Sequence, residues 1–426
     1  MLNIKLANKH RTCDGVTRRG FIQLGAFGFA GLTLANLYEA EAAAGIRNSN
    51  RALINIHLGG GPSHQDIYDL KPNAPVEFRG EFNPINTNVA GMQICEHLPK
   101  LAKMADKFAV IRSLVGSNAG HSNFQTHTGY NTRSLVNVGG RPSIGSVVTK
   151  LQGSQGGAPA FVSYNGGSPG YLGPVYSPFS PNDAKNVLRM DRGMTVDRLS
   201  GRTNLLTSLD GIRRDLDASG KMEALDSYTQ QAYDMVTSGK VADAMDLGTE
   251  DPEIVREYGK TNSNLLVARR LIQCGVRVIT MQGMWGGWDT HSNNFTNLKS
   301  RNLPTMDHGL STLLTDLERN DMLQDVTVVV WGEFGRTPRV NTRGGRDHWP
   351  RLSHAFLAGG GLKTGQMIGA STKYAEYAQD RPIDYQEVHA TLYHTLGIDT
   401  TTAQIKDPNG RPQYLLDMRE PVAELV

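Results

Sequence analysis

The chain has 426 residues and a net charge of +3, from 44 Lys and Arg against 41 Asp and Glu. This length allows about two or three domains and a large buried core. The charges nearly balance and no basic run occurs beyond the N-terminus, so we expect no nucleic-acid partner. The three cysteines, Cys13, Cys95 and Cys274, form no Cys-x-x-Cys pair, which argues against a thiolate zinc site and a disulfide framework.

The N-terminal segment has the pattern of an export signal. Arg18 and Arg19 precede an apolar stretch rich in Gly and Ala that extends to about Leu37, and small residues at cleavage-type spacing follow it. The pattern resembles a twin-arginine signal over residues 1–44, so we expect contact with the twin-arginine translocation machinery and a periplasmic or secreted protein. Retention of the segment as an uncleaved anchor is the alternative. No other stretch approaches the roughly 20 apolar residues that a membrane span needs, so no further membrane contact is expected.

Strand and helix patterns alternate through the rest of the chain. The expected strands cover residues 52–58, 108–112, 277–282, 326–331 and 355–358, and the expected helices cover residues 98–104, 143–151, 306–317 and 388–396. Alternation of this kind predicts a three-layer α/β/α sandwich with a mostly parallel central sheet, formed by residues 45–426. Residues 153–272 begin with Gly, Pro and Ser-rich loops and continue with helical spacing, so we expect a loop-rich and helical insertion or cap there.

Three of these strands lead into loops that carry both a carboxylate and an imidazole or guanidinium. The loops contain His64 and Asp66 after the first strand, Asp289 and His291 after the second, and Glu333, Arg336, Asp347 and His348 after the third. Ligands of open α/β sheets bind outside the carboxyl ends of the strands. If the three strands are parallel, these side chains converge on one crevice.

The residue types suit a metal site. Asp289 and His291 can present an oxygen and a nitrogen to one divalent ion, while Asp347 and His348 can hold a second ion or bridge the two. With Asp66, three carboxylates would offset most of the charge of two ions and leave a pocket that attracts an anionic ester. A single Asp-x-His pair is more often only a capping feature of a loop, and the recurrence at three strand ends favours a site.

Two further residues near the third strand are candidates for the chemistry. Arg336 is expected to clamp a tetrahedral oxyanion through its guanidinium. Glu333 either orients an imidazole or pairs with Arg336, and the sequence leaves both open.

The strings Gly59–Asp66, Trp288–His291, Gly332–Pro338 and Gly344–Trp349 resemble a bacterial family of exported proteins, domain of unknown function 1501. That family is grouped with the sulfatases and alkaline phosphatases, and the resemblance covers about residues 50–400. It implies a sulfatase-like fold, with Asp347 and His348 as the Asp-His pair of one ion and Asp289 and His291 on the other. His354 would be the late third ligand, and Asp66 or His64 would replace the first-strand carboxylate.

The nucleophile departs from the pattern of that superfamily. There, a Ser, Thr or modified Cys begins a helix that ends near a Thr-Gly, and Thr128 with Gly129 fits that end. The position counted back from them is Ala119, which cannot attack. Ser122 and His121 are the neighbouring candidates, His121 also as a metal ligand. Either the nucleophile is displaced, or a metal-bound water attacks, or the protein is catalytically silent.

The sequence thus predicts an exported metallohydrolase of the sulfatase or phosphatase type that acts on an anionic sulfate or phosphate ester. Two divalent ions are expected, and zinc, calcium and manganese are not distinguished. The alternative is a non-catalytic binding or surface-assembly protein on the same fold. The sequence does not determine the oligomeric state.

Overall fold

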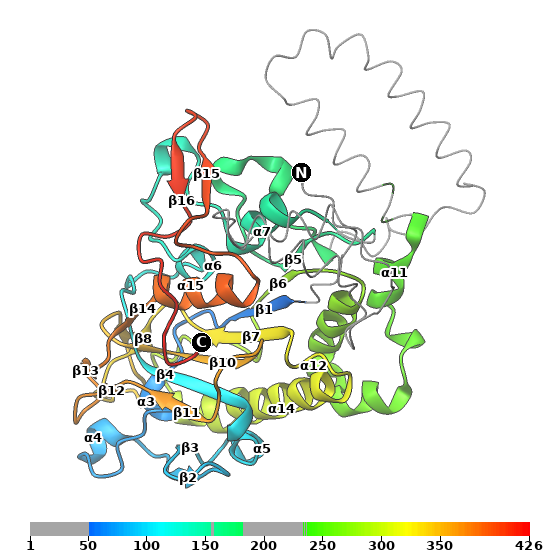
Figure 1. Cartoon of the computed structure of the whole chain (residues 1–426). Helices are drawn as coiled ribbons and strands as arrows, with labels where there is room; N and C mark the ends of the chain where they lie inside the picture. The colour runs from blue at the N-terminus through cyan, green and yellow to red at the C-terminus, as the bar shows by residue number, and fades with distance from the viewer. Residues whose placement is uncertain (1–50, 155–156, 182–232, 234, 236) are drawn as a thin grey trace, which may run out of the picture.

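The computed structural model describes residues 51–154, 157–181, 233, 235 and 237–426, and within them one large sheet organises the chain (Figure 1). Its order is β11-β4-β10-β7-β1-β6-β5, and β14 also pairs with β4. The strands are β1 (Ala52–His57), β4 (Phe108–Val115), β5 (Phe161–Tyr164), β6 (Val278–Gln282), β7 (Val326–Trp331), β10 (Ser353–Gly359), β11 (Gln366–Ile368) and β14 (Ile383–Asp384).

The sheet is mostly parallel. β1 lies between β7 and β6 and is parallel to both, and β5 extends the parallel run at the edge. β10 alone runs antiparallel, between β7 and β4. The predicted sandwich is confirmed, and the three strands that precede the polar loops are direct neighbours, so their carboxyl ends meet at one edge.

Two helical layers cover the sheet because its strands are apolar on both faces. Ile54 and Ile56 of β1 belong to the core on one side, and Leu53 belongs to the core on the other side. The first side is covered chiefly by α5 (Pro99–Ala102), α12 (Pro252–Gln273) and α14 (Leu303–Arg319), and the second by α7 (Ile144–Gln152) and α15 (Tyr385–Thr395). A strand buried on both faces reads as a continuous apolar run, which is why these strands were recognisable.

Short elements complete the described chain. The helices are α3 (His64–Ile67), α4 (Val76–Arg79), α6 (Phe124–Thr128), α11 (Lys240–Met245) and α13 (Asn294–Asn297). The small pairs of strands are β2 (Pro84–Asn86) with β3 (Gln93–Cys95), β8 (Gly335–Arg336) with β9 (His348–Trp349), β12 (Ala370–Ser371) with β13 (Ala378–Asp380), and β15 (Gln404–Lys406) with β16 (Pro412–Tyr414).

The stretch predicted as an insertion or cap, residues 153–272, needs a correction at both ends. β5 pairs with β6 and is part of the main sheet. The C-terminal half of α12 buries Leu265, Leu266 and Leu271 in the main core. A four-residue strand among Gly-rich loops has too little periodicity to be recognised, and α12 shows the same spacing as any amphipathic helix. The helical pattern from residue 195 lies largely outside the described residues.

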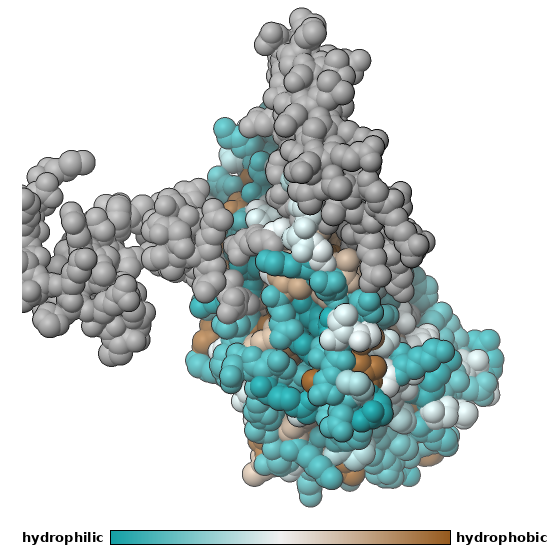
Figure 2. Space-filling model, turned by 90° about the vertical axis from the view of Figure 1, so that its right-hand side faces the viewer, coloured by the Kyte–Doolittle hydropathy of each residue, from teal (hydrophilic) through white to brown (hydrophobic). Residues whose placement is uncertain are grey.

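The predicted signal, residues 1–44, also lies outside the described residues. Within the part of the chain that the structure describes, no helix is long and apolar enough to span a membrane. The face shown in Figure 2 is largely hydrophilic where it is coloured, with scattered hydrophobic residues.

Candidate metal centre

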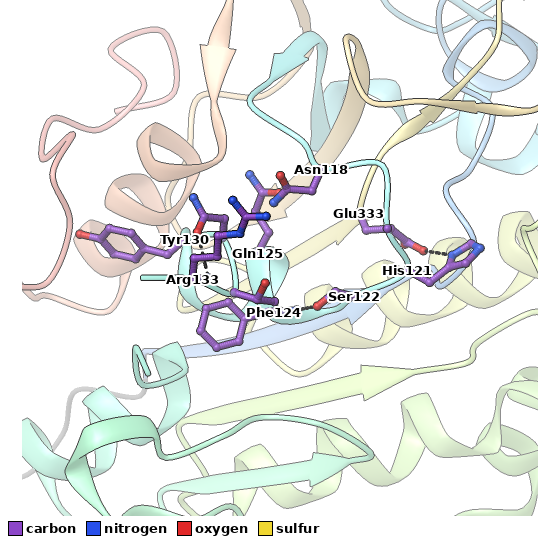
Figure 3. Close-up of a pocket in the computed structure, with 11 residues that line it drawn as sticks. Asn118, His121, Ser122, Phe124, Gln125, Tyr130, Arg133 and Glu333 are labelled. Atoms are coloured by element: carbon purple, nitrogen blue, oxygen red, sulfur yellow. Dashed lines mark hydrogen bonds and ion pairs between the residues drawn. The ribbon is translucent and has the colours of Figure 1, made fainter. Parts of the chain in front are cut away.

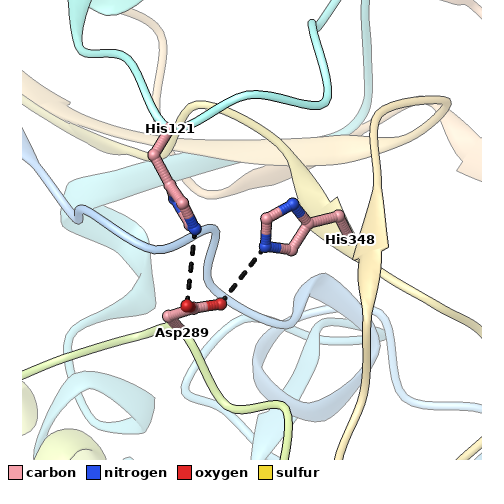
Figure 4. A group of neighbouring side chains, drawn as sticks. All are labelled: His121, Asp289 and His348. Carbon is pink, nitrogen blue, oxygen red and sulfur yellow. Dashed lines mark hydrogen bonds and ion pairs between the residues drawn. The ribbon is translucent and has the colours of Figure 1, made fainter.

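Loops from different parts of the chain bring an aspartate and three histidines together at the carboxyl edge of the sheet. Asp289 and His291 follow β6, His348 begins β9, and His121 precedes α6. One ligand atom each from His121, Asp289 and His348 lies within 4.8 Å of the other two (Figure 4). His291 lies outside this group of three, although its Nε2 atom is 3.2 Å from Asp289 Oδ1. The loops after β6 and β7 therefore converge as expected, and His121 joins them from the segment between β4 and α6.

Each of the three imidazoles is oriented through its Nδ1 atom. His121 Nδ1 donates to Glu333 Oε1 at 2.9 Å, and His291 Nδ1 donates to Asp347 Oδ1 at 2.5 Å. His348 Nδ1 donates to the backbone oxygen of Ala119 at 2.9 Å. Since carboxylates and carbonyl oxygens only accept, the proton of each neutral ring lies on Nδ1. In the neutral form of these rings, Nε2 therefore carries the lone pair.

All three Nε2 atoms face the same carboxylate. His121 Nε2 is 3.4 Å from Asp289 Oδ2, and His348 Nε2 is 3.3 Å from Asp289 Oδ1. Neutral imidazole lone pairs and a carboxylate repel one another unless a positive charge lies among them. A metal-ligating histidine usually donates its other N–H to a carboxylate or carbonyl, which is the arrangement seen here. The donor set therefore fits a divalent cation.

The carboxylates of the centre are held in the ionised form. Burial alone would raise the pKa of Asp289, but the hydrogen bond and the charge of Arg336 hold this pKa below its usual value. The hydrogen bond from His291 lowers the pKa of Asp347. At neutral pH, Asp289 is therefore ionised and can bind a cation, and Asp347 is ionised and can accept the hydrogen bond from His291.

Glu333 orients an imidazole, which resolves the choice that the sequence left open. This buried carboxylate also accepts the backbone N–H of Gly60 at 2.8 Å. Its Oε2 atom lies 3.4 Å from His57 Nε2, although it has no hydrogen-bond partner among the described residues. Glu333 therefore ties His121 to the loop that follows β1.

The glycine run after β1 allows the loops to approach closely. Gly60 has φ +112°, and a Cβ there would lie 2.3 Å from the backbone nitrogen of Asp289. A side chain at this position would displace the Asp289 loop. The Gly60 amide is used by Glu333, so it does not face an anion in the open site.

Arg336 lies beneath the centre, not in it. Its side chain is fully buried, donates to the backbone oxygens of Gly61 and Arg346 at 2.9 Å each, and also contacts Gly60 and Asp289. A guanidinium with its donors used in this way is not free to clamp an oxyanion. The structure instead gives it the role of joining three loops.

Three predicted metal ligands lie outside the cluster and are buried elsewhere. Asp66 forms a two-point ion pair with Arg346, with distances of 2.8 and 2.9 Å, and accepts from Asn294 and Ser63. His64 Nε2 is 3.1 Å from the backbone oxygen of Ala375. His354 is fully buried in the core. The structure does not bring these three side chains to Asp289.

Ser122, the candidate nucleophile, lies beside the centre because it follows His121. Its Oγ accepts the backbone N–H of Phe124 at 3.2 Å, at the start of α6. It lines two cavities that meet at His121 and Glu333. No basic side chain among the described residues is hydrogen-bonded to this hydroxyl.

The features that sequence reasoning missed are backbone and supporting groups. The Ala119 carbonyl and the Phe334 ring, whose centroid is 4.3 Å from that of His348, position the imidazoles. A sequence pattern cannot show which backbone carbonyl will accept a hydrogen bond from a histidine. The sequence Gly332–Pro338 around Phe334 was noted, but it did not indicate that the Phe334 ring packs against His348.

Comparison with family models gives a match over residues 50–426, to the family described as "Protein of unknown function (DUF1501)". The chain belongs to this family. Among curated proteins, none matches the DUF1501 chain.

Solved structures similar to this DUF1501 chain include Ps i-CgsB, with a TM-score of 0.38 and 10% identity over 82% of this chain and 72% of the other. They also include the PsFucS1 sulfatase from Pseudoalteromonas sp., with a TM-score of 0.35 and 11% identity over 87% of this chain and 72% of the other.

Proposed function

We propose that this protein is a metal-dependent hydrolase of a sulfate or phosphate ester, with its centre at His121, Asp289, His291 and His348. The observation that carries the proposal is the convergence of three Nε2 atoms on the Asp289 carboxylate, with each ring oriented by an acceptor at Nδ1. A bound divalent ion would polarise the ester and stabilise the leaving oxygen.

The ligand set also bears on the metal and the substrate. Three of the four ligands are neutral imidazoles, so a divalent ion would keep net positive charge and attract an anionic ester. Imidazole nitrogen suits zinc and similar transition metals, whereas calcium prefers oxygen ligands. We therefore expect zinc or a related metal in preference to calcium.

The chain's own residues would position the reaction. Asp289, braced by Arg336, sets the location of the cation, and Glu333 and Asp347 hold two imidazoles in place. The Ser122 hydroxyl is the nearest candidate nucleophile in the sequence, and a solvent water is the alternative. In Ser122→Ala, loss of turnover with metal retained favours the hydroxyl, whereas retained turnover favours water.

The central test is metal analysis of the purified protein followed by a screen of aryl sulfates and phosphate esters. The sequence suggested two ions, but the described residues form a single candidate cluster, and Asp66, His64 and His354 lie outside it. We therefore propose about one tightly bound divalent ion per chain, and His348→Ala should lose both the metal and turnover. His394→Ala is the matched control, because His394 is an exposed histidine on α15. Chelation should also lower the melting temperature of the wild-type protein.

Two outcomes would count against the proposal. Purified protein without a tightly bound divalent ion, and unable to take one up, rejects the metal centre. Metal bound at this centre without turnover of any ester would favour the non-catalytic binding protein instead.

We further propose export through the twin-arginine pathway, on the sequence pattern alone. Arg18→Lys combined with Arg19→Lys should leave the protein in the cytoplasmic fraction, measured by cell fractionation and immunoblotting. Unchanged export of this variant would reject a twin-arginine route.

A further inference from the structure

A cavity of about 630 Å³ adjoins the metal centre on the side of α6 (Figure 3). His121, Ser122 and Glu333 form one end of it, and Tyr130, Phe124 and Arg133 lie toward the other end. The first end shares His121 with the metal centre. A molecule whose ester group reached the centre would therefore have room for its non-reacting part here.

The lining of this cavity is polar but carries little negative charge. Amides and hydroxyls come from Asn118, Gln125, Asn131, Thr132 and Ser122, and an apolar surface comes from Phe124. Glu333 is the carboxylate in the lining, and it is already bonded to His121 and Gly60. Such a lining suits a hydroxyl-rich molecule, because a few placed polar groups together with an aromatic face determine orientation.

Arg133 supplies an exposed positive charge at the far end of this cavity. Its backbone nitrogen bonds to Asn131 Oδ1 at 3.0 Å, which fixes the turn, while its side chain is exposed. Among the described residues, no carboxylate forms an ion pair with its guanidinium. Arg336 and Arg346, in contrast, are fully buried and bonded to carboxylates and carbonyls.

We propose that Arg133 binds a second negative group on the substrate, so that the substrate is an acidic sugar carrying the sulfate or phosphate ester. The inference rests on the proposed function for the position of the ester. The cavity takes the sugar ring, and the guanidinium pairs with a carboxylate or further sulfate on it.

The test compares two substrates that differ by one charge, glucose 3-sulfate and glucuronic acid 3-sulfate, or the two 3-phosphates if the protein hydrolyses phosphate esters. Arg133→Ala should raise KM for the glucuronic acid ester about tenfold and leave KM for the glucose ester unchanged. The kcat should be unchanged for both, because Arg133 is not among the residues of the metal centre. Arg133→Lys should restore part of the affinity, since lysine keeps the charge but loses the planar fork.

Arg256→Ala is the matched control, because Arg256 is an exposed arginine at the start of α12. Equal KM changes for both substrates, or none, would overturn the inference. If no ester is hydrolysed, calorimetry can still measure the binding of the same two sugar esters and so test the subsite. If the wild-type protein binds the glucuronic acid ester more tightly than the glucose ester, and Arg133→Ala abolishes this preference, the subsite is supported although the proposed function has failed. If the wild-type protein shows no such preference, the subsite is rejected.

Discussion

The loops after β1 and after β6 carry the same kinds of side chain, yet the fold uses them in opposite ways. His64 and Asp66, after β1, are fully buried, and Asp66 is paired with Arg346. Asp289 and His291, after β6, reach the surface, and the Nε2 of His291 faces the Asp289 carboxylate. An Asp and a His after a strand can therefore form either an internal brace or a ligand set. Burial of the carboxylate decides which, because Asp289 also pairs with a buried arginine, Arg336, and still reaches the surface.

The brace also supports the metal centre. Arg346 directly precedes Asp347 and His348, and its pair with Asp66 fixes where β9 begins. The buried loop thus positions the ligand-bearing loop, while the Asp289 loop presents its ligands to solvent.

The largest expected effect is on stability. Asp66→Asn leaves the buried guanidinium of Arg346 without its counter-charge, so we expect the free energy of unfolding to fall by about 3–5 kcal/mol. Urea denaturation measures this loss. Glu253→Gln, which breaks an exposed pair with Arg256, is the control and should change stability by less than about 0.5 kcal/mol. Unchanged stability together with lost metal would instead make Asp66 a ligand.

A smaller effect is expected at the exposed loop. Asp347→Ala removes the acceptor of His291 Nδ1, so the metal affinity should fall by about 10- to 100-fold with little change in stability. Competition with a chromogenic chelator measures the affinity. Asp380→Ala, an exposed aspartate of β13, is the control. An unchanged affinity would show that the imidazole needs no such partner.

The smallest effect concerns pH and the buried histidines. Burial lowers the pKa of His354 to about 3 and that of His64 to about 4. The unfolded chain takes up these protons near pH 6.5, so the stability they confer is complete above pH 6.5 and is lost as the pH falls toward 4. His354→Leu should reduce the slope of unfolding free energy against pH in this window by roughly 1.4 kcal/mol per pH unit. Chemical denaturation at several pH values measures it, and an unchanged slope would show that His354 is not the group that titrates.

Much of the fold was predictable because its strongest signals are local. The strand over residues 326–331 is a run of buried apolar residues, and the structure has β7 at those bounds. The helix expected at residues 388–396 is α15 (Tyr385–Thr395), and its start was placed three residues late although the capping box of Asp384 and Glu387 marks it. β5 was missed because four residues among glycines carry too little periodicity.

The candidate site was predictable only in part. Asp289, His291, Asp347 and His348 were selected because they follow parallel strands, and the structure brings them together. Metal binding by Asp289, His291 and His348 stays a prediction, whereas Asp347 was expected as a ligand and instead accepts a hydrogen bond from His291. Arg336 could not be distinguished from a surface arginine, because its burial depends on the carbonyls of loops distant in sequence.

By itself, the sequence determined the layered α/β architecture and the sheet edge at which polar loops gather, because hydrophobic periodicity and glycine positions act within a few residues. Only the tertiary structure decided which polar side chains point to solvent and which are buried against a partner. That choice depends on contacts between segments such as Asp66 and Arg346, 280 residues apart, which no local pattern encodes.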